Sequence, residues 1–395
     1  MRVCAVICEY NPFHLGHAYH LRAAREASGA DYVLCLMSGA LTQRGSFARH
    51  DKWLRARAAL ENGADVVLEL PARFACSPAP DFAGGGVALL AALGVVTHLS
   101  FGCEPSALPM LSAAASLFKS ESPDFSAALQ RSLADGLPYP RARALAAEQL
   151  AEIPADLLAQ PNAALALEYL QALPETLVPV PIARRGSGYH DASLSALSSA
   201  TAVRAALARG GLTAALAAVP SPEALRAAEE SGFVHEEEAL TQALLYRLRT
   251  ASPAELAALY GMDEGLENRF IAAAQTCSTR ETLLDCVKTR RYTRARLSRL
   301  SAYELMKLNR NYSKTHSEPD NASVLGFRKS AAPLLKTINQ RSSIPLITKA
   351  ANFDRSNPLF ALDVLAQDLW SLGVSNPSLR ASGRDFTTSP AILSR

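Results

Sequence analysis

Two histidines, His14 and His17, stand three positions apart where an apolar segment gives way to a predicted helix. Side chains at this spacing can reach one ligand above a helix N-terminus, and Gly16 lets that ligand approach the backbone closely. The free N–H groups and positive dipole end of a helix start favour phosphate. A metal-binding pair or two surface histidines are the alternatives, but no third metal ligand is evident nearby and His20 is expected on a different part of the helix.

Short apolar segments alternate with helical patterns through the first two hundred residues. The apolar segments, each expected to be a strand, cover residues 2–8, 32–37, 66–70, 95–101 and 177–182. The helical patterns cover residues 16–27, 52–61, 87–93 and much of 106–173, and another begins near 201. This alternation predicts βαβ units and a parallel sheet buried on both faces. Because Pro179 and Pro181 interrupt the last segment, that strand is expected at an edge of the sheet.

Polar or glycine-containing loops follow four of these strands, at residues 9–17, 38–45, 102–104 and 184–191. Ligands of open parallel sheets bind outside the carboxyl ends of the strands, so the four loops are expected to share one site. The run Gly84-Gly85-Gly86 lacks the spacing of a dinucleotide loop and is expected to form a turn that opens a helix.

The length of 395 residues predicts two domains, and the strand alternation ends near residue 212. We therefore expect a Rossmann-like α/β domain with a parallel sheet at 1–212 and a mainly helical domain at 213–395. Within the second part, helices are expected to about 308, a loop at 309–321, a helix at 331–340, an apolar run at 344–347 and a helix at 359–372. His235, which precedes three glutamates, is expected on a solvated helix.

Composition excludes several classes of protein. The chain is 49% hydrophobic and 19% charged, which is typical of a soluble globular protein and not of a disordered one. No apolar run approaches the roughly 20 residues of a membrane helix, and the first apolar run stops at Glu9 without a cleavage site. Seven cysteines without any CxxC indicate a reduced, cytoplasmic chain with neither a zinc site nor a disulfide framework.

A second element, Ser199-Ala200-Thr201-Ala202-Val203-Arg204, precedes an alanine-rich helix. Alone it would be an ordinary helix N-cap. Together with the earlier strand and His-Leu-Gly-His, it resembles the HIGH-motif nucleotidylyltransferase superfamily, whose members attack the α-phosphate of a nucleoside triphosphate and expel pyrophosphate. The resemblance implies that Ser199, Thr201 and Arg204 hold the triphosphate.

Further motifs make the resemblance narrower and extend it from residue 2 to about 354. They are Glu9-Tyr10-Asn11-Pro12-Phe13-His14-Leu15-Gly16-His17, Gln43-Arg44-Gly45, Ser100-Phe101-Gly102-Cys103-Glu104, Pro161-Asn162, Leu167-Glu168-Tyr169-Leu170, Gly188-Tyr189-His190-Asp191 and Lys288-Thr289-Arg290-Arg291-Tyr292-Thr293-Arg294. In this order they look like the bacterial tRNA(Met) cytidine acetate ligase family. The resemblance implies that acetate attacks ATP to give acetyl-adenylate and pyrophosphate. The wobble cytidine of elongator tRNA(Met) then takes the acetyl group on N4 and AMP leaves.

The resemblance also implies a set of site residues, with His14 and His17 as the catalytic pair on the phosphates. The ATP-binding residues would be Ile7, Cys8, Glu9, Tyr10, Asn11, Pro12, Phe13, His14, Leu15, Gly16, His17, Ala18, Tyr19, His20, Gly102, Asn162, Arg184 or its neighbour Arg185, Ser199 and Thr201. Mg²⁺ is expected as the counter-ion of the triphosphate, held largely by phosphates and water, and no dedicated protein site for a metal is expected.

A basic segment suggests contact with RNA. Between Lys288 and Arg310 there are eight Lys or Arg residues and one acidic residue, Glu304. Such a stripe is typical of phosphate-backbone binding, although a solvated helix face would look similar. The resemblance favours tRNA binding through Lys288, Arg290, Arg291, Tyr292 and Arg294, with Tyr292 as a stacking ring.

Two other functions are compatible with part of this pattern. A nucleotidylyltransferase acting on a small phosphorylated metabolite would keep both phosphate-binding elements but have no use for the basic segment. An RNA-binding or assembly protein with a vestigial nucleotide site would keep the basic segment, but the intact histidine pair argues against it.

Overall fold

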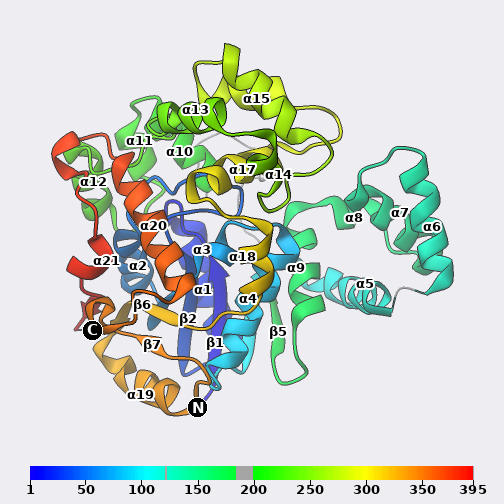
Figure 1. Ribbon diagram of the computed structural model, residues 1–395. Helices are drawn as coiled ribbons and strands as arrows, with labels where there is room; N and C mark the ends of the chain where they lie inside the picture. The colour runs from blue at the N-terminus through cyan, green and yellow to red at the C-terminus, as the bar shows by residue number, and fades with distance from the viewer. Residues whose placement is uncertain (121, 184–198, 395) are drawn as a thin grey trace.

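The computed structural model describes residues 1–120, 122–183 and 199–394, and within them an eight-stranded sheet forms the centre of the molecule (Figure 1). The strand order is β5-β4-β1-β2-β3-β6-β7, and β8 pairs with β6 beside this path. The strands are β1 (Val3–Cys8), β2 (Tyr32–Ser38), β3 (Val66–Leu70), β4 (His98–Gly102), β5 (Val178–Ile182), β6 (Ala322–Arg328), β7 (Leu346–Ile347) and β8 (Ala391–Leu393). Strands β1 to β5 pair in parallel, whereas β6 runs antiparallel to β3.

Both faces of the sheet are buried, as the continuous apolar strands predict. Successive side chains of β1 alternate between two cores, because neighbouring residues of a strand point to opposite faces. Cys4 and Val6 pack under α1 (Leu15–Ser28) and α2 (Lys52–Glu61). Val3 and Ala5 belong to the opposite core, which includes α4 (Ala79–Ala92), α19 (Ala332–Arg341) and the first turn of α20 (Pro358–Leu372). The expected α/β fold is confirmed.

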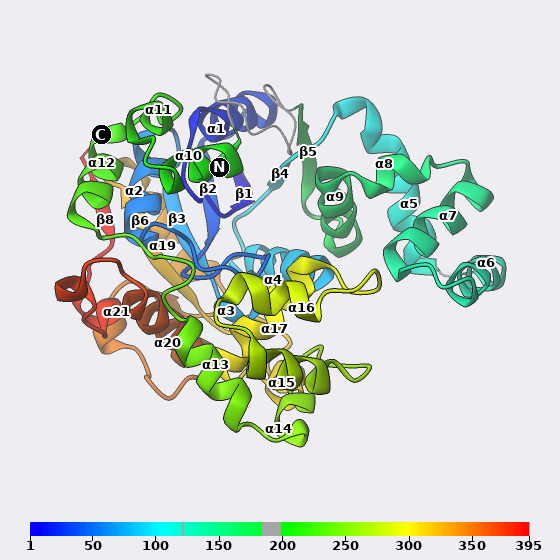
Figure 2. The ribbon, with the colours of Figure 1, turned by 90° about the horizontal axis from the view of Figure 1, so that it is seen from above.

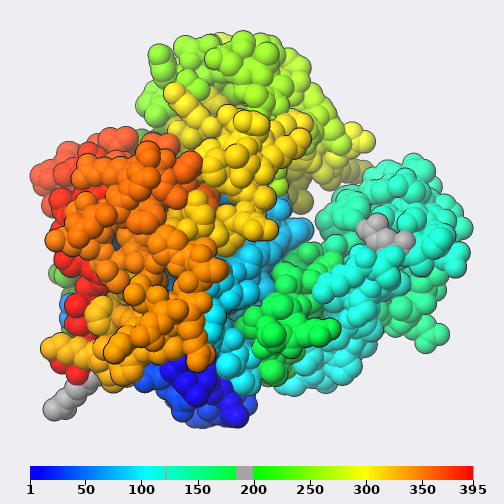
Figure 3. All heavy atoms as spheres, turned by 60° about the horizontal axis from the view of Figure 1, so that its bottom comes forward, coloured from blue at the N-terminus to red at the C-terminus, as the bar shows by residue number. Residues whose placement is uncertain are grey.

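Five helices between β4 and β5 make a lobe at the side of the sheet. They are α5 (Leu108–Ser120), α6 (Pro123–Ala134), α7 (Tyr139–Ala151), α8 (Ala155–Ala159) and α9 (Pro161–Ala172). Both ribbon views place α5 to α8 away from the sheet, with α9 packed against α4 (Figures 1 and 2). The space-filling view shows this cyan and green lobe standing out from the body (Figure 3).

The helices after β5 form two further groups. A short group next to α1 and α2 consists of α10 (Ala200–Ala208), α11 (Leu212–Leu216) and α12 (Pro222–Ser231). A larger group has its own core around Trp370 of α20. Its other helices are α13 (Thr241–Thr250), α14 (Pro253–Ala257), α15 (Leu266–Thr276), α16 (Arg280–Val287), α17 (Arg294–Met306) and α18 (Arg310–Thr315). The remaining short elements are α3 (Ala72–Ala75), α21 (Arg384–Thr387) and 3-10 turns at Pro105–Ala107, Lys329–Ala331, Ala350–Asn352 and Pro377–Leu379.

The five strands predicted in the first two hundred residues are all present, and β5 lies at the edge of the sheet as its prolines predict. Three local predictions are wrong. Strand β4 begins at His98 and not at residue 95. Residues 84–86 lie inside helix α4 and form no turn. Glycine is needed there for close packing, since a Cβ on Gly85 would lie 2.2 Å from the Phe74 ring. The polar stretch 309–321 contains α18, capped by the side chain of Asn309.

Strands β6 and β8 were not predicted. Gly326 interrupts the apolar pattern of β6, and it is needed there because a Cβ would lie 2.7 Å from the carbonyl oxygen of Ala391 in β8. The sheet therefore contains strands from both sides of residue 212, and the domain boundary at that residue stays a prediction. Within the described part of the chain, no helix has the length and apolar character needed to cross a membrane.

Candidate active site

A cavity of about 420 Å³ lies at the carboxyl ends of β1, β4 and β5, where the sheet rule places a ligand. Its walls come from the loop after β1, the loop after β2, the start of α1, helix α9 and the start of α10. The predicted residues that line it are Ile7, Cys8, Glu9, Tyr10, Asn11, His14, Gly16, His17, Tyr19, His20, Gly102, Asn162, Ser199 and Thr201. The loops expected to share one site therefore do so wherever the structure describes them.

Some predicted residues do not line the cavity. Phe13 is buried in the core under α1, and Leu15 holds the helix start in place by donating its backbone N–H to the carbonyl of Ala218. Pro12 and Ala18 also lie outside the lining. Arg184 and Arg185 lie outside the described residues. Because a continuous stretch of ATP-binding residues was expected, the alternation between inward and outward positions was missed.

Other lining residues were not predicted individually. From the loop after β2 they are Thr42, Gln43, Arg44 and Ser46, and from other elements they include Phe82, Phe101, Leu165 and Tyr169. Arg204, which was expected at the triphosphate, also lines the cavity. The motif Gln43-Arg44-Gly45 pointed to this loop, and the motif around Tyr169 to helix α9. The apolar members had no signal in the sequence, since any core residue has the same type.

The two histidines form a stacked pair at the start of α1, with ring centroids 3.7 Å apart. The Nδ1 atom of His14 accepts the backbone N–H of Gly16 at 3.0 Å, and the Nδ1 atom of His17 accepts the backbone N–H of His14 at 3.3 Å. A ring nitrogen that accepts a hydrogen bond carries no proton, so each neutral imidazole keeps its proton on Nε2. Because the helix cap occupies both Nδ1 atoms, each neutral ring donates through Nε2–H.

A second helix start, that of α10, faces the same cavity. The hydroxyl of Ser199 caps it by accepting the backbone N–H of Ala202 at 3.2 Å. Arg204, one turn further on, donates to the backbone carbonyl of Asn11 and, at 3.3 Å, to the hydroxyl of Thr201. The guanidinium therefore joins α10 to the loop after β1. Two helix N-termini and a cation next to one cavity favour a polyanionic ligand.

Arg55 of α2 holds the ends of β1 and β2 together from behind the cavity. Its side chain is buried and donates to the backbone carbonyls of Glu9 at 2.6 Å, Ser38 at 3.0 Å and Gly39. Burial lowers the pKa of Arg55 to about 10, so the guanidinium is charged at neutral pH. The two loops that line the cavity are therefore fixed by one buried cation.

Beside Arg55, the buried ammonium of Lys52 contacts Glu69 at 2.8 Å and Asp385 at 2.7 Å. Burial opposes its charge, but the carboxylates of Asp385 and Glu69 together raise the pKa of Lys52. Asp385 belongs to α21, so this ion pair anchors the last helix of the chain to the sheet. A buried pair of this kind is costly to break from one side.

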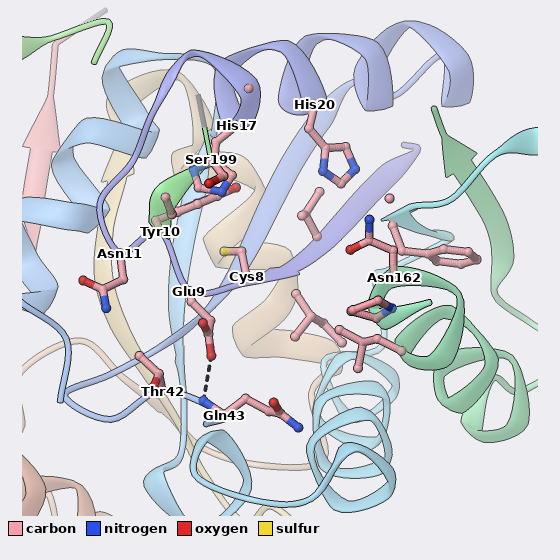
Figure 4. A pocket seen from close by; sticks show the side chains of 18 of the residues that line it. Cys8, Glu9, Tyr10, Asn11, His17, His20, Thr42, Gln43, Asn162 and Ser199 are labelled. Carbon is pink, nitrogen blue, oxygen red and sulfur yellow. Dashed lines mark hydrogen bonds between the residues drawn. The ribbon is translucent and has the colours of Figure 1, made fainter. Parts of the chain in front are cut away.

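Three groups of side chains are distinguishable around the cavity (Figure 4). His17 and Ser199 lie on one side. His20 and Asn162 lie on another, where His20 Nε2 is 3.0 Å from the Ser100 hydroxyl and burial lowers the pKa of His20 to about 4. Glu9 lies on the third side, with its Oε1 accepting the backbone N–H of Gln43 at 2.6 Å.

The basic segment lies at the start of α17, and its charges are partly paired. Arg291 lies 3.7 Å from Glu264, and Arg294 contacts Glu281 at 2.6 Å as well as Asp285. Lys288 and Arg290 are exposed. The prediction of Tyr292 as a stacking ring is wrong for this arrangement, because the side chain is 5% exposed and belongs to the core around Trp370.

Known proteins resemble this chain over nearly its whole length. The model of the HIGH Nucleotidyl Transferase family matches residues 1–385. A tRNA(Met) cytidine acetate ligase of Halothermothrix orenii is 36% identical over 98% of both chains, and one of Syntrophomonas wolfei is 35% identical over 99% of both. The crystal structure of Thermotoga maritima TmcAL bound with alpha-thio ATP has a TM-score of 0.92 and 29% identity over the whole of both chains. Its apo form has a TM-score of 0.93 and 30% identity.

The fold and the paired helix starts define a HIGH nucleotidyl transferase. Within that class, the chain belongs to the tRNA(Met) cytidine acetate ligase family, which confirms the resemblance seen in its motifs.

Proposed function

We propose that this protein activates acetate with ATP and transfers the acetyl group to N4 of the wobble cytidine in elongator tRNA(Met). The observation that carries the proposal is the histidine pair, whose two Nδ1 atoms accept backbone N–H groups at the start of α1, beside the capped start of α10. Membership of the ligase family supports the choice of acceptor. A tRNA substrate in turn implies a cytoplasmic enzyme.

In the first step, a carboxylate oxygen of acetate attacks the α-phosphorus of ATP and pyrophosphate leaves with its electron pair. The Nε2–H groups of the histidine pair and the start of α10 would stabilise the charge that grows on the leaving phosphates. On the opposite side, Gly102 and Asn162 line the part of the cavity that we assign to the nucleoside. In the second step the cytidine amine attacks the acetyl carbon and AMP leaves.

Magnesium would accompany the triphosphate and neutralise part of its charge when bound. Among the residues that the structure describes, no three His, Cys, Asp or Glu side chains form a group able to hold a metal ion. The ion would therefore be held mainly by phosphate oxygens and water, as Mg²⁺ commonly is in nucleotide sites.

We assign the RNA contact to Lys288, Arg290, Arg291 and Arg294, which precede or begin α17. We assign ATP binding to residues 1–212 and RNA binding to residues 213–395. The bound ATP and the acceptor nucleotide of the RNA would then both lie at the cavity.

The test is an incubation of the protein with ATP, [¹⁴C]acetate and an unmodified tRNA(Met) transcript. Label in the RNA, with AMP and pyrophosphate released, is the expected result. Release of pyrophosphate from ATP without label in the RNA would instead support a nucleotidylyltransferase acting on a small metabolite. Absence of both products would contradict enzymatic activity of either kind.

A further inference from the structure

Glu9 is the one acidic side chain among the described residues that line the cavity. It follows the last residue of β1, and both its backbone and its side chain are fixed. Its carbonyl oxygen accepts from Arg55 at 2.6 Å, and its Oε1 accepts the backbone N–H of Gln43 at 2.6 Å. The close-up shows the carboxylate directed toward the loop of Thr42 and Gln43, on the side away from His17 and Ser199 (Figure 4).

The loop that fixes Glu9 is itself held from outside the cavity. Arg299 of α17 donates to the backbone carbonyl of Gln43 at 3.1 Å. The carboxylate oxygen Oε1 is therefore tied to a supported backbone group. In the described part of the chain, Oε2 accepts no hydrogen bond, so it is the oxygen left to meet a ligand.

A fixed carboxylate repels phosphates and acetate, and it binds a group that donates N–H or O–H. Two amines are present in the proposed reaction, N6 of adenine and N4 of cytosine. Carboxylates characteristically accept from N4 of cytosine, whereas an Asn amide pairs with N6 and N7 of adenine. Asn162 lies across the cavity from Glu9 and offers that amide (Figure 4). Adenine therefore suits Asn162, and Glu9 is left for the cytosine.

We propose that Glu9 is a catalytic residue of acetyl transfer, binding the N4 amine of the acceptor cytidine and taking its proton. The inference rests on the proposed function. The lone pair of N4 attacks the carbonyl carbon of acetyl-adenylate, and the bond from that carbon to the phosphate oxygen breaks with its electrons going to AMP. The proton lost by N4 moves to Oε2 of Glu9. The amine of cytosine is a weak nucleophile because its lone pair is delocalised into the ring, so a base at this position accelerates the step.

The experiment compares Glu9→Gln and Glu9→Asp with the wild-type protein. Adenylate formation is followed by acetate-dependent exchange of pyrophosphate into ATP, and transfer by single-turnover acetylation of the tRNA(Met) transcript. Glu9→Gln is expected to lower the ratio of transfer to exchange by about a hundredfold, within the range of lost base catalysis. Glu9→Asp, which keeps the charge, is expected to restore part of that ratio. Hydroxylamine needs no base, so its acetylation by Glu9→Gln should fall only as far as the exchange does.

Glu175→Gln is the matched control, since Glu175 precedes β5, is exposed and does not line the cavity. Its ratio of transfer to exchange should equal that of the wild-type protein. An equal loss of exchange and transfer in Glu9→Gln would overturn the inference and assign the carboxylate to ATP or its metal ion. A raised KM for ATP in Glu9→Gln but not for purine riboside triphosphate, which lacks N6, would also overturn it, in favour of adenine recognition. A wild-type protein without any acetate-dependent exchange would overturn the proposed function instead.

Discussion

The hydroxyl of Ser298 donates a hydrogen bond to the backbone carbonyl of Gly45 at 2.9 Å, and this bond joins α17 to the loop after β2. Arg280 reaches the same carbonyl at 3.3 Å. The loop lines the cavity through its residues on either side of Gly45, and α17 begins with the segment assigned to RNA. The nucleotide cavity and the basic segment are therefore connected through one helix and one loop.

Gly45 is expected to tolerate no side chain where it meets α17. Its φ is +81°, and a Cβ would lie 2.3 Å from the backbone nitrogen of Arg299. Gly45→Ala should cost about 1–2 kcal/mol for the left-handed backbone and a further 1–3 kcal/mol for overpacking. Gly136→Ala is the matched control, because Gly136 has the same φ with nothing within 4 Å. Urea unfolding of both variants measures the difference, and equal destabilisation would contradict the close approach of the two backbones.

His17→Ala is expected to lower adenylate formation by a hundredfold or more, about 3 kcal/mol of barrier, because a donor to the leaving phosphates is removed. The measurement is pyrophosphate release from ATP and acetate. His98→Ala, at the start of β4 and outside the cavity lining, should keep wild-type activity. All three proteins should be folded under the assay conditions, with His17→Ala unfolding at a somewhat lower midpoint because its ring also caps α1. Pyrophosphate release at the wild-type rate by His17→Ala would contradict the assignment of the histidine pair to the phosphates.

Replacement of Arg290, Arg291 and Arg294 by Ala is expected to weaken tRNA binding and to flatten its dependence on salt, by about one slope unit for each phosphate that is no longer neutralised. Arg290 should contribute most, because Arg291 and Arg294 already pair with acidic residues. Filter binding over a range of salt concentrations tests this, with Lys336→Ala on α19 as the control. Loss of adenylate formation together with binding would indicate a structural role for the three arginines.

His235 is expected to make the protein less stable as the pH falls. Its ring is buried against Phe47 and Trp370, and burial lowers its pKa from 6.5 to about 4. Below pH 6.5 His235 binds a proton in the unfolded chain but stays neutral in the folded protein. Stability is therefore lost between pH 6.5 and 4. The loss from pH 7 to pH 5 is about 2 kcal/mol. Urea unfolding should show a smaller loss over this interval in His235→Gln, and an unchanged loss would place the titration elsewhere.

The N-terminal half of the fold could be predicted because its signals are local. Each strand is a short apolar run, and the loops after four of the five carry their own polar motif, as Glu9 to His17 does after β1. The sheet rule then brings these loops together without knowledge of any side-chain packing. The i, i+3 spacing of His14 and His17 predicted that both side chains face one ligand, whereas their stacking and the bonds to their Nδ1 atoms are seen only in the structure.

The parts that could not be predicted depend on partners distant in the chain. His235 precedes three glutamates, which suggested a solvated helix, but its ring packs against Phe47 and Trp370 and it pairs with Val374. Tyr292 lies in a basic run, yet its ring fills the core around Trp370. In each case a charged run next to the residue in the sequence suggested exposure, whereas its apolar neighbours in space decide that it is buried.

The pairing of β6 with β3 has a consequence for synthesis on the ribosome. When Val66–Leu70 emerges, its outer edge has no partner, and Ala322–Arg328 follows about 250 residues later. At about 5–20 residues per second, the nascent chain carries an unpaired edge for on the order of ten seconds or more. Exposed edges of this kind recruit other strands, so the nascent chain is open to aggregation or chaperone binding until translation is almost complete.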